Sequence, residues 1–203
     1  IYYNGIASDY PANATYGSQN VWSNDYIAVW HLEEGQDTTI EGYIDATANN
    51  LNGTGVDMND SGTTVGQLGS SARFDGVDDY IGVATSSLLQ PRSLTVSAWQ
   101  NYDTSKLNFI FDAALSYGND GYTLLTVPSG ESEFELAGKS GDASSISATS
   151  TSSSSPAAWS YVSGVFNNDN NSFRTYLNAV AGNESVFNTE IDYIPTESRI
   201  GSQ

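Results

Sequence analysis

Apolar and polar residues alternate with a period of two in several short stretches of the chain. In the segment 92–99, Leu94, Val96 and Ala98 would share one face of an extended strand, and Trp99 would lie on the opposite face. The same alternation predicts strands at 122–127, 160–166 and 173–177. No segment has a convincing helical period. The pattern therefore predicts an all-β sandwich of antiparallel strands that is nearly free of helix.

Turn residues separate these strands. Gly118–Gly121, Pro128–Gly130 and Asn167–Asn171 are rich in Gly, Asn and Asp, which favour turns. The segment Ser140–Ser155 is almost wholly small and polar, so we expect a long exposed loop there, with an inter-domain linker as the alternative.

Charge and composition exclude several classes of protein. The chain has 24 Asp and Glu residues against six Lys and Arg, which gives a net charge of −18. So few cations cannot neutralise phosphates, so we expect no nucleic-acid partner. No apolar run approaches the roughly 20 residues that span a bilayer, so we expect no membrane insertion of this segment. The chain has no Cys, which excludes thiolate metal sites and cysteine nucleophiles.

Six short motifs, in the expected order, resemble the LamG-like, concanavalin A-like jelly-roll family of surface proteins. The motifs are Ala28–Glu33, Gly69–Tyr80, Ser93–Trp99, Trp159–Val162, Thr175–Asn178 and Arg199–Gly201. Asp45 and Asn49–Gly53 follow the first motif and support it. The resemblance implies a concanavalin A-like jelly roll with two antiparallel sheets, and it implies an extracellular or cell-surface location.

The residues at both ends of the given sequence lead to two further predictions. Residues 1–22 resemble the tail of a domain that often precedes such modules, on the strength of Tyr2-Tyr3-Asn4-Gly5. We therefore expect a preceding tail or linker at 1–22 and a jelly-roll domain at 23–203. The family usually continues to a closing strand beyond the Arg-Ile-Gly motif, so we expect an open sheet edge that a further segment or a neighbouring chain would fill.

The resemblance implies a structural Ca²⁺ ion. Members of this fold class often hold Ca²⁺ at the Phe-Asp-Gly turn, which nominates the Gly76 carbonyl together with Asp75, Asp78 or Glu33. Calcium takes six to eight oxygen ligands, and carboxylates and carbonyls supply them. Turn chemistry is the alternative role of these carboxylates, because Asp side chains accept hydrogen bonds from turn amides.

Sugar binding by this fold would use exposed aromatic faces beside polar loop residues. The candidate glycan-binding residues are Trp99, Tyr102, Tyr117 and Tyr122. An aromatic face offers apolar area that matches the C–H face of a sugar ring.

One group of carboxylates resembles a catalytic strand. Glu131, Glu133 and Glu135 alternate on one face and resemble the Glu-x-Asp-x-Glu strand of laminarinase-like glucanases, although the middle residue differs. Neighbouring Cα atoms in the triplet would lie about 6.6 Å apart, compatible with a retaining pair of carboxyls. A solvated strand face is the interpretation that we favour, so we expect no enzyme.

The sequence therefore favours a non-catalytic extracellular recognition or adhesion module that binds a polysaccharide or a surface glycoprotein. A structural surface or filament subunit, completed by neighbouring copies of itself, is the second hypothesis. A glycoside hydrolase is the third. The fold alone does not choose among them.

Overall fold

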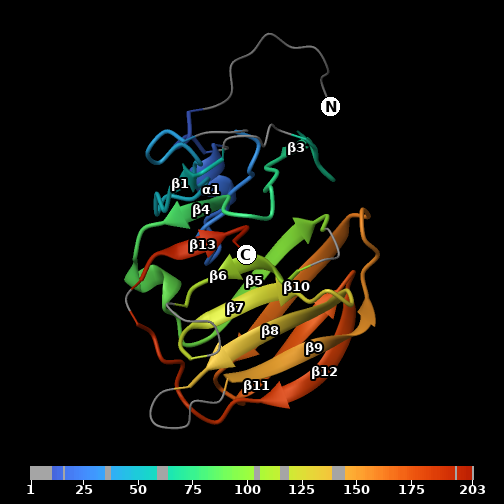
Figure 1. Cartoon of the computed structure of the whole chain (residues 1–203). Helices are drawn as coiled ribbons and strands as arrows, with labels where there is room; N and C mark the ends of the chain where they lie inside the picture. Colours follow the sequence, from blue (N-terminus) through green and yellow to red (C-terminus); the bar gives the residue numbers. More distant parts are fainter. Residues whose placement is uncertain are drawn as a thin grey trace.

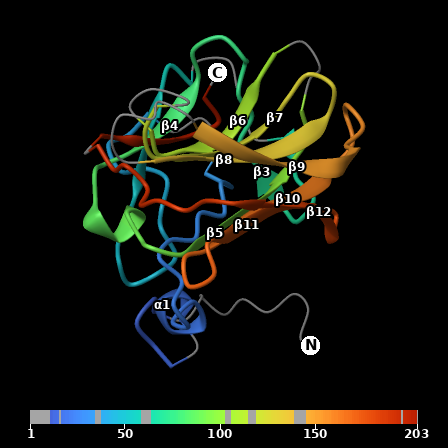
Figure 2. The ribbon, with the colours of Figure 1, turned by 90° about the horizontal axis from the view of Figure 1, so that it is seen from below.

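The computed structural model describes residues 11–15, 17–34, 38–58, 64–102, 106–114, 119–138, 145–194 and 196–202. Two antiparallel sheets face each other as the layers of a sandwich (Figures 1 and 2). The larger sheet has seven strands in the spatial order β1-β4-β13-β6-β7-β8-β9. Its strands are β1 (Gly53–Val56), β4 (Tyr80–Val83), β13 (Ser198–Ile200), β6 (Asn108–Asp112), β7 (Tyr122–Thr126), β8 (Glu131–Ala137) and β9 (Ser145–Ser153).

The smaller sheet has four strands in the order β12-β11-β10-β5. They are β12 (Val180–Val186), β11 (Ser172–Leu177), β10 (Ser160–Asn167) and β5 (Leu94–Gln100). A separate pair is formed by β2 (Thr64–Val65) and β3 (Ser70–Ser71). The prediction of a nearly helix-free jelly-roll sandwich is confirmed, and the four strands expected from alternation are all present.

Helices are few and short in the described part of the chain. They are α1 (Ser18–Val21), which lies outside the sandwich, and the 3-10 turn η1 (Ser87–Leu89) between β4 and β5 (Figures 1 and 2). No helix in the described ranges has the length and apolar character needed to cross a membrane.

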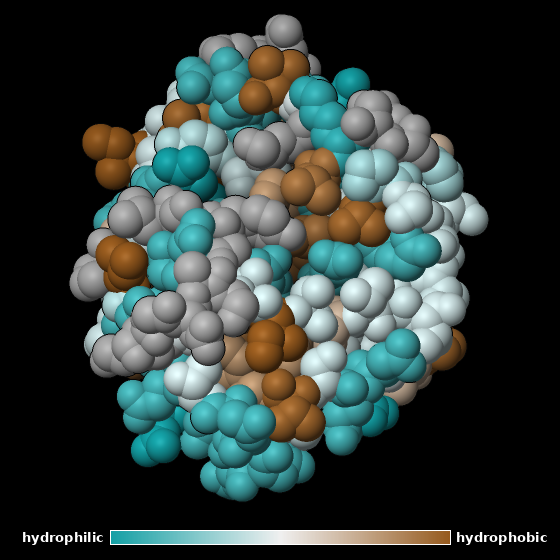
Figure 3. All heavy atoms as spheres, turned by 60° about the horizontal axis from the view of Figure 1, so that its bottom comes forward, coloured by the Kyte–Doolittle hydropathy of each residue, from teal (hydrophilic) through white to brown (hydrophobic). Residues whose placement is uncertain are grey.

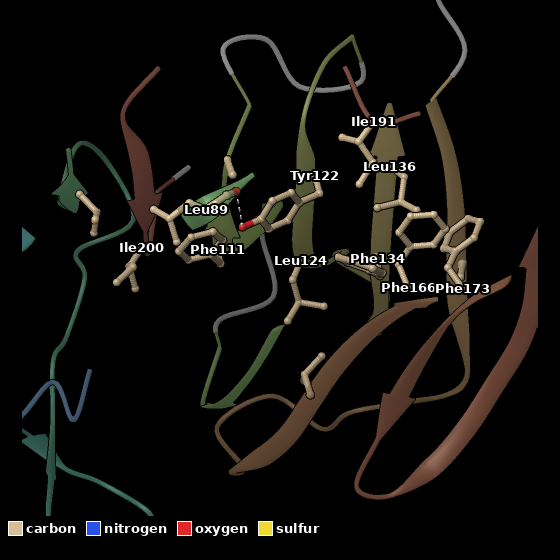
Figure 4. Close-up of a cluster of buried hydrophobic side chains, with 14 of the residues drawn as sticks. Leu89, Phe111, Tyr122, Leu124, Phe134, Leu136, Phe166, Phe173, Ile191 and Ile200 are labelled. Carbon is tan, nitrogen blue, oxygen red and sulfur yellow. Dashed lines mark hydrogen bonds between the residues drawn. The ribbon is translucent and has the colours of Figure 1, made fainter. Parts of the chain in front are cut away.

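A continuous series of aromatic contacts runs through the core. Phe111 stacks on Tyr122 with ring centroids 5.8 Å apart, Tyr122 meets the edge of Phe134 at 6.5 Å, and Phe134 meets Phe173 at 6.4 Å. Figure 4 shows these side chains between the two sheets, with the Tyr122 hydroxyl turned toward Leu89. Edge-to-face and offset contacts at such distances add stability beyond that of the buried area. The series therefore links the larger sheet to the smaller one.

A glycine allows a core aromatic ring to pack closely between the sheets. Gly164 lies in the middle of β10, and a Cβ atom at this position would overlap the ring of Phe134 on β8. Val162 and Phe166, on either side of Gly164, point into the core and are 0% and 2% exposed. The absence of a side chain at 164 therefore makes room for the Phe134 ring.

The prediction of an exposed loop over Ser140–Ser155 is wrong for the nine residues of β9. β9 is the edge strand of the larger sheet and pairs with β8 from Glu131↔Ser153 to Ala137↔Ser145. Ala148 is 1% exposed and faces the core, and its carbonyl accepts a hydrogen bond of 2.5 Å from Thr175 Oγ1 of the other sheet. The backbone carbonyls of β9 thus accept hydrogen bonds from hydroxyl groups of the other sheet, and the strand forms although its run of Ser and Thr has no apolar alternation.

The edge of the smaller sheet is formed by β5. Among the strands that the structure describes, β5 pairs only with β10. Leu94 and Val96 pack against the core but remain half-buried. An uncharged seven-residue edge is one that proteins usually cover. The predicted open edge would therefore lie at β5, and its occupant stays a prediction.

We predict that Gly164→Ala destabilises the sandwich. The added methyl group would force Phe134 from its position, and such overpacking typically costs about 1–3 kcal/mol. Urea denaturation followed by tryptophan fluorescence measures this free energy. Ser97→Ala, at an exposed position on the outer face of the neighbouring strand β5, is the control and should change stability by less than about 0.5 kcal/mol. Equal unfolding midpoints for the two variants would contradict the packing described here.

Candidate functional site

Two aromatic side chains lie side by side on the outer face of the smaller sheet. Trp99 and Tyr161 are directly paired across β5 and β10, with ring centroids 5.3 Å apart and an angle of 56° between the rings. Trp99 is 43% exposed and Tyr161 is 37% exposed. Both point outward because their neighbours along each strand, Ala98 and Val162, face the interior. The pair therefore forms an exposed aromatic surface on a rigid sheet.

The backbone beside this pair is fixed by a side-chain amide. Asn178 follows β11, and its Oδ1 atom accepts a hydrogen bond of 2.9 Å from the Tyr161 N–H. Its own N–H donates to the Tyr161 carbonyl at 2.8 Å. The φ angle of Asn178 is 50°, a conformation that Asn adopts more readily than most residues. The two bonds hold Tyr161 in place at the start of β10.

The surroundings of the pair are polar but uncharged. Ser97 pairs with Ser163 in the adjacent row, and Ser163 pairs with Tyr176 of β11, so these residues share the outer face with Trp99. Neither β5 nor β10 contains a charged residue. Exposed rings beside hydroxyl groups can stack on the apolar face of a sugar and accept or donate hydrogen bonds to its hydroxyls.

Only one of the other three nominated aromatic residues stays open as a candidate. Tyr102 is 7% exposed and donates its hydroxyl to the Ser154 carbonyl at 3.0 Å. Tyr122 is 3% exposed and donates to the Leu89 carbonyl at 3.2 Å. Both are corrected to core packing, since neither ring presents a face to solvent. Tyr117 lies outside the described residues.

Tyr161 was missed by the sequence reasoning, although the signal was present. It alternates with Val162 and Gly164 in the predicted strand, so it had to face away from the core. What the sequence did not show is the register of β5 against β10, which places Tyr161 opposite Trp99.

The nominated metal ligands lie mainly in one acidic turn. Single carboxylate oxygens of Asp75, Asp78 and Asp79 lie within 4.8 Å of one another. Asp75 Oδ1 accepts the Val77 N–H at 2.7 Å, and Asp79 Oδ2 accepts the Asp75 N–H at 2.8 Å. The first of these bonds is the main reason why the pKa of Asp75 is lowered. Hydrogen bonds from turn amides thus use some of the carboxylate oxygens that a metal ion would need.

The remaining nominated groups are less favourable for a metal ion. The Gly76 carbonyl accepts a hydrogen bond of 2.6 Å from Lys106 Nζ, so an ammonium group already provides positive charge there. Glu33 is exposed and does not belong to the carboxylate group within 4.8 Å. The pKa of Asp78 is raised by desolvation and by the neighbouring carboxylates, chiefly Asp75. Asp78 is therefore the carboxylate that a cation would most affect.

The three glutamates of β8 share the outer face of the larger sheet, as the alternation predicted. A hydrogen bond from the Ser129 hydroxyl lowers the pKa of Glu131, whereas burial and then the charge of Glu135 raise the pKa of Glu133. Glu135 is 6% exposed, and its Oε1 atom is buried without a hydrogen-bond partner among the residues that the structure describes. The burial and hydrogen bonding of the three glutamate carboxyl groups thus differ along β8, and a catalytic role for them stays a hypothesis.

Comparison of the sequence with models of protein families identifies the family of this chain. A model of the concanavalin A-like lectin/glucanases superfamily matches residues 75–202, which is more than half of the chain. The chain belongs to this superfamily. The match covers the Phe-Asp-Gly turn from Asp75 onward and both strands that carry Trp99 and Tyr161. No curated protein matches the sequence.

Solved structures of this superfamily fold are similar over most of the chain. Domain 4 of AbnA, an extracellular GH43 arabinanase from Geobacillus stearothermophilus, in complex with arabinotriose, has a TM-score of 0.60 at 16% identity, with 87% of this chain and 84% of that chain covered. The binding domain of botulinum neurotoxin serotype D has a TM-score of 0.53 at 15% identity, with 86% and 44% covered.

A third similar structure comes from a surface-layer protein. The S-layer domain-containing protein from Clostridium thermocellum (residues 221–444) has a TM-score of 0.51 at 23% identity, with 78% of this chain and 71% of that chain covered. At these identities, the three likenesses show the fold alone.

We predict that any Ca²⁺ bound at the acidic turn acts through Asp78. A ligand that binds only the native state raises the melting temperature, so millimolar Ca²⁺ added after EDTA treatment should raise it for the native sequence. Asp78→Asn should remove most of that rise, and Glu33→Gln, which changes an exposed carboxylate outside the group, should not. Coincident melting curves in EDTA and in Ca²⁺ would contradict a calcium site in this turn.

Proposed function

We propose that this member of the superfamily is a non-catalytic carbohydrate-binding module, and that Trp99 and Tyr161 contact the sugar. The observation that carries the proposal is the pairing of two exposed aromatic rings on two neighbouring strands that contain no charged residue. Large aromatic faces left open to water are costly unless a partner covers them, and a sugar ring supplies a matching apolar face.

The net charge of −18 favours a neutral glycan over an anionic one. A long-range repulsion would oppose acidic polysaccharides, whereas neutral chains meet no such barrier. We propose that the ligand is a neutral polysaccharide or the neutral glycan of a surface glycoprotein, outside the cell. The arabinotriose complex of the arabinanase domain makes arabinan one sensible member of a test panel.

A second candidate function is that of a structural surface subunit. The uncharged edge of β5 favours it, because a seven-residue strand that pairs on one side only, among the described strands, can accept a strand from a neighbouring copy. Light scattering after gel filtration separates the two candidates. A monomer across micromolar concentrations supports the binding module, and concentration-dependent oligomers support the structural subunit.

The proposal predicts that Trp99→Ala and Tyr161→Ala each weaken polysaccharide binding at least tenfold, which corresponds to about 1.4 kcal/mol. Affinity electrophoresis or calorimetry against arabinan, xylan, β-glucan and agar measures the loss. Tyr26→Ala is the matched control, since Tyr26 is 50% exposed but lies outside the smaller sheet. Native affinity in both variants, or no binding to any member of the panel, would contradict the proposal.

The same panel tests the absence of catalysis. We expect no release of reducing ends from any polysaccharide, and no change of affinity in Glu133→Gln. Turnover that disappears in Glu131→Gln or Glu135→Gln would replace the binding module by a glycoside hydrolase.

A further inference from the structure

A cleft lies where three connections meet beside the start of β5. Its volume is about 360 Å³, and Gln90, Arg92, Asn168, Glu190, Ile191 and Tyr193 line it. Clefts that bind small ligands have volumes of about 300–1,000 Å³, so this one lies near the lower end of the range. None of these residues belongs to the Trp99–Tyr161 surface, which is formed near the opposite end of β5.

Hydrogen bonds between elements fix the walls of the cleft. The Tyr193 hydroxyl donates to the Pro91 carbonyl at 2.7 Å, which joins the segment after β12 to the segment before β5. The Asn168 N–H donates to Ser93 Oγ at 2.9 Å, which joins the β10–β11 turn to the same segment. Burial raises the pKa of Tyr193, so its hydroxyl remains a neutral donor. The three walls are therefore held together before any ligand binds.

The floor of the cleft is anchored as well. Ile191 is 7% exposed and forms an isolated β-bridge with Gly138, at the end of β8. Asp192 receives a hydrogen bond from the Gly121 N–H at 2.7 Å and donates one to the Ala137 carbonyl at 2.9 Å. A preformed cleft reduces the ordering cost of binding.

The lining carries complementary polar groups. Arg92 can only donate hydrogen bonds, Glu190 in its ionised form can only accept them, and the amides of Gln90 and Asn168 do both. The described ion pairs join Arg174 to Glu184 and Arg199 to Glu197, so Arg92 has no carboxylate within 4.0 Å among the described residues. No described carboxylate therefore neutralises this guanidinium, which lines the cleft.

We infer that this cleft binds a single neutral sugar ring, such as the terminal residue of a glycan chain. Hydroxyl groups both donate and accept, so one sugar ring can satisfy Arg92, Glu190 and the two amides together. Its C–H face would pack on Tyr193 and Ile191. The presence of Glu190 and the net charge of −18 both oppose an acidic sugar. On the face of the molecule that Figure 3 draws, hydrophobic residues lie in separate groups among hydrophilic ones.

The inference rests on the proposed function for the class of ligand, but not for the place where it binds. Two-dimensional ¹H–¹⁵N spectra of the whole chain separate the two, because the side-chain amides of Gln90 and Asn168 report on the cleft. Glucose, galactose, mannose and arabinose are the probes, and glucuronate is the acidic counterpart of glucose. At least one neutral sugar should shift both amides saturably at millimolar concentration, and glucuronate should bind at least tenfold more weakly.

Variants complete the test. Arg92→Met and Glu190→Gln should each raise the dissociation constant that is fitted to the sugar-dependent shifts at least tenfold. Arg73→Met, at an exposed arginine outside the cleft, should leave this constant unchanged. Trp99→Ala should also leave it unchanged. Shifts that occur only near Trp99 would overturn the cleft site and leave the proposed function standing. Stronger binding of glucuronate, or no shift of either amide with any sugar, would overturn the inference, and polysaccharide binding would then decide the proposed function independently.

Discussion

The structure depends on the contact between the Phe134 ring and the backbone of Gly164, which brings the two sheets together. Phe134 continues the aromatic series from Tyr122 on its own sheet to Phe173 on the other. Since Gly164 faces this ring, the residues before and after it in β10 are constrained to face outward. Tyr161 is placed on the outer surface by the same alternation. The interior packing and the exposed aromatic pair are thus two consequences of one strand register.

The architecture separates two kinds of surface. The part of the smaller sheet formed by β5 and β10 has no charged residue and carries two aromatic rings on its outer face, which suits an extended chain of sugar residues. The cleft beside the start of β5 is small, is lined by groups of both charges, and suits one ring. The acidic turn around Asp75 is a third feature, in which turn amides and Lys106 already stabilise much of the charge. If both proposed sites bind sugar, recognition is distributed over a sheet and the connections at its end.

Much of the fold could be predicted from the sequence because alternation reports directly on which residues face a core. The strands β5 and β11 follow that rule, since buried or half-buried residues alternate with more exposed ones along most of each strand. β9 does not, because its contacts to the other sheet are hydroxyl bonds such as that of Thr175 to Ala148, and a run of Ser and Thr gives no apolar period. The site was harder to predict. Alternation with Val162 indicates that Tyr161 faces outward, but only the pairing of β5 with β10 places it opposite Trp99.

The most direct test of the central claim follows Trp99 itself. The chain contains four tryptophans, so incorporation of 5-fluorotryptophan should give a separate ¹⁹F resonance for each. Trp30, whose indole N–H is bonded to the Leu51 carbonyl at 2.8 Å, serves as an internal reference. Titration with a neutral oligosaccharide that the chain binds should move the Trp99 resonance saturably and leave that of Trp30 in place. A Trp99 resonance that stays fixed while the sugar binds would contradict the account.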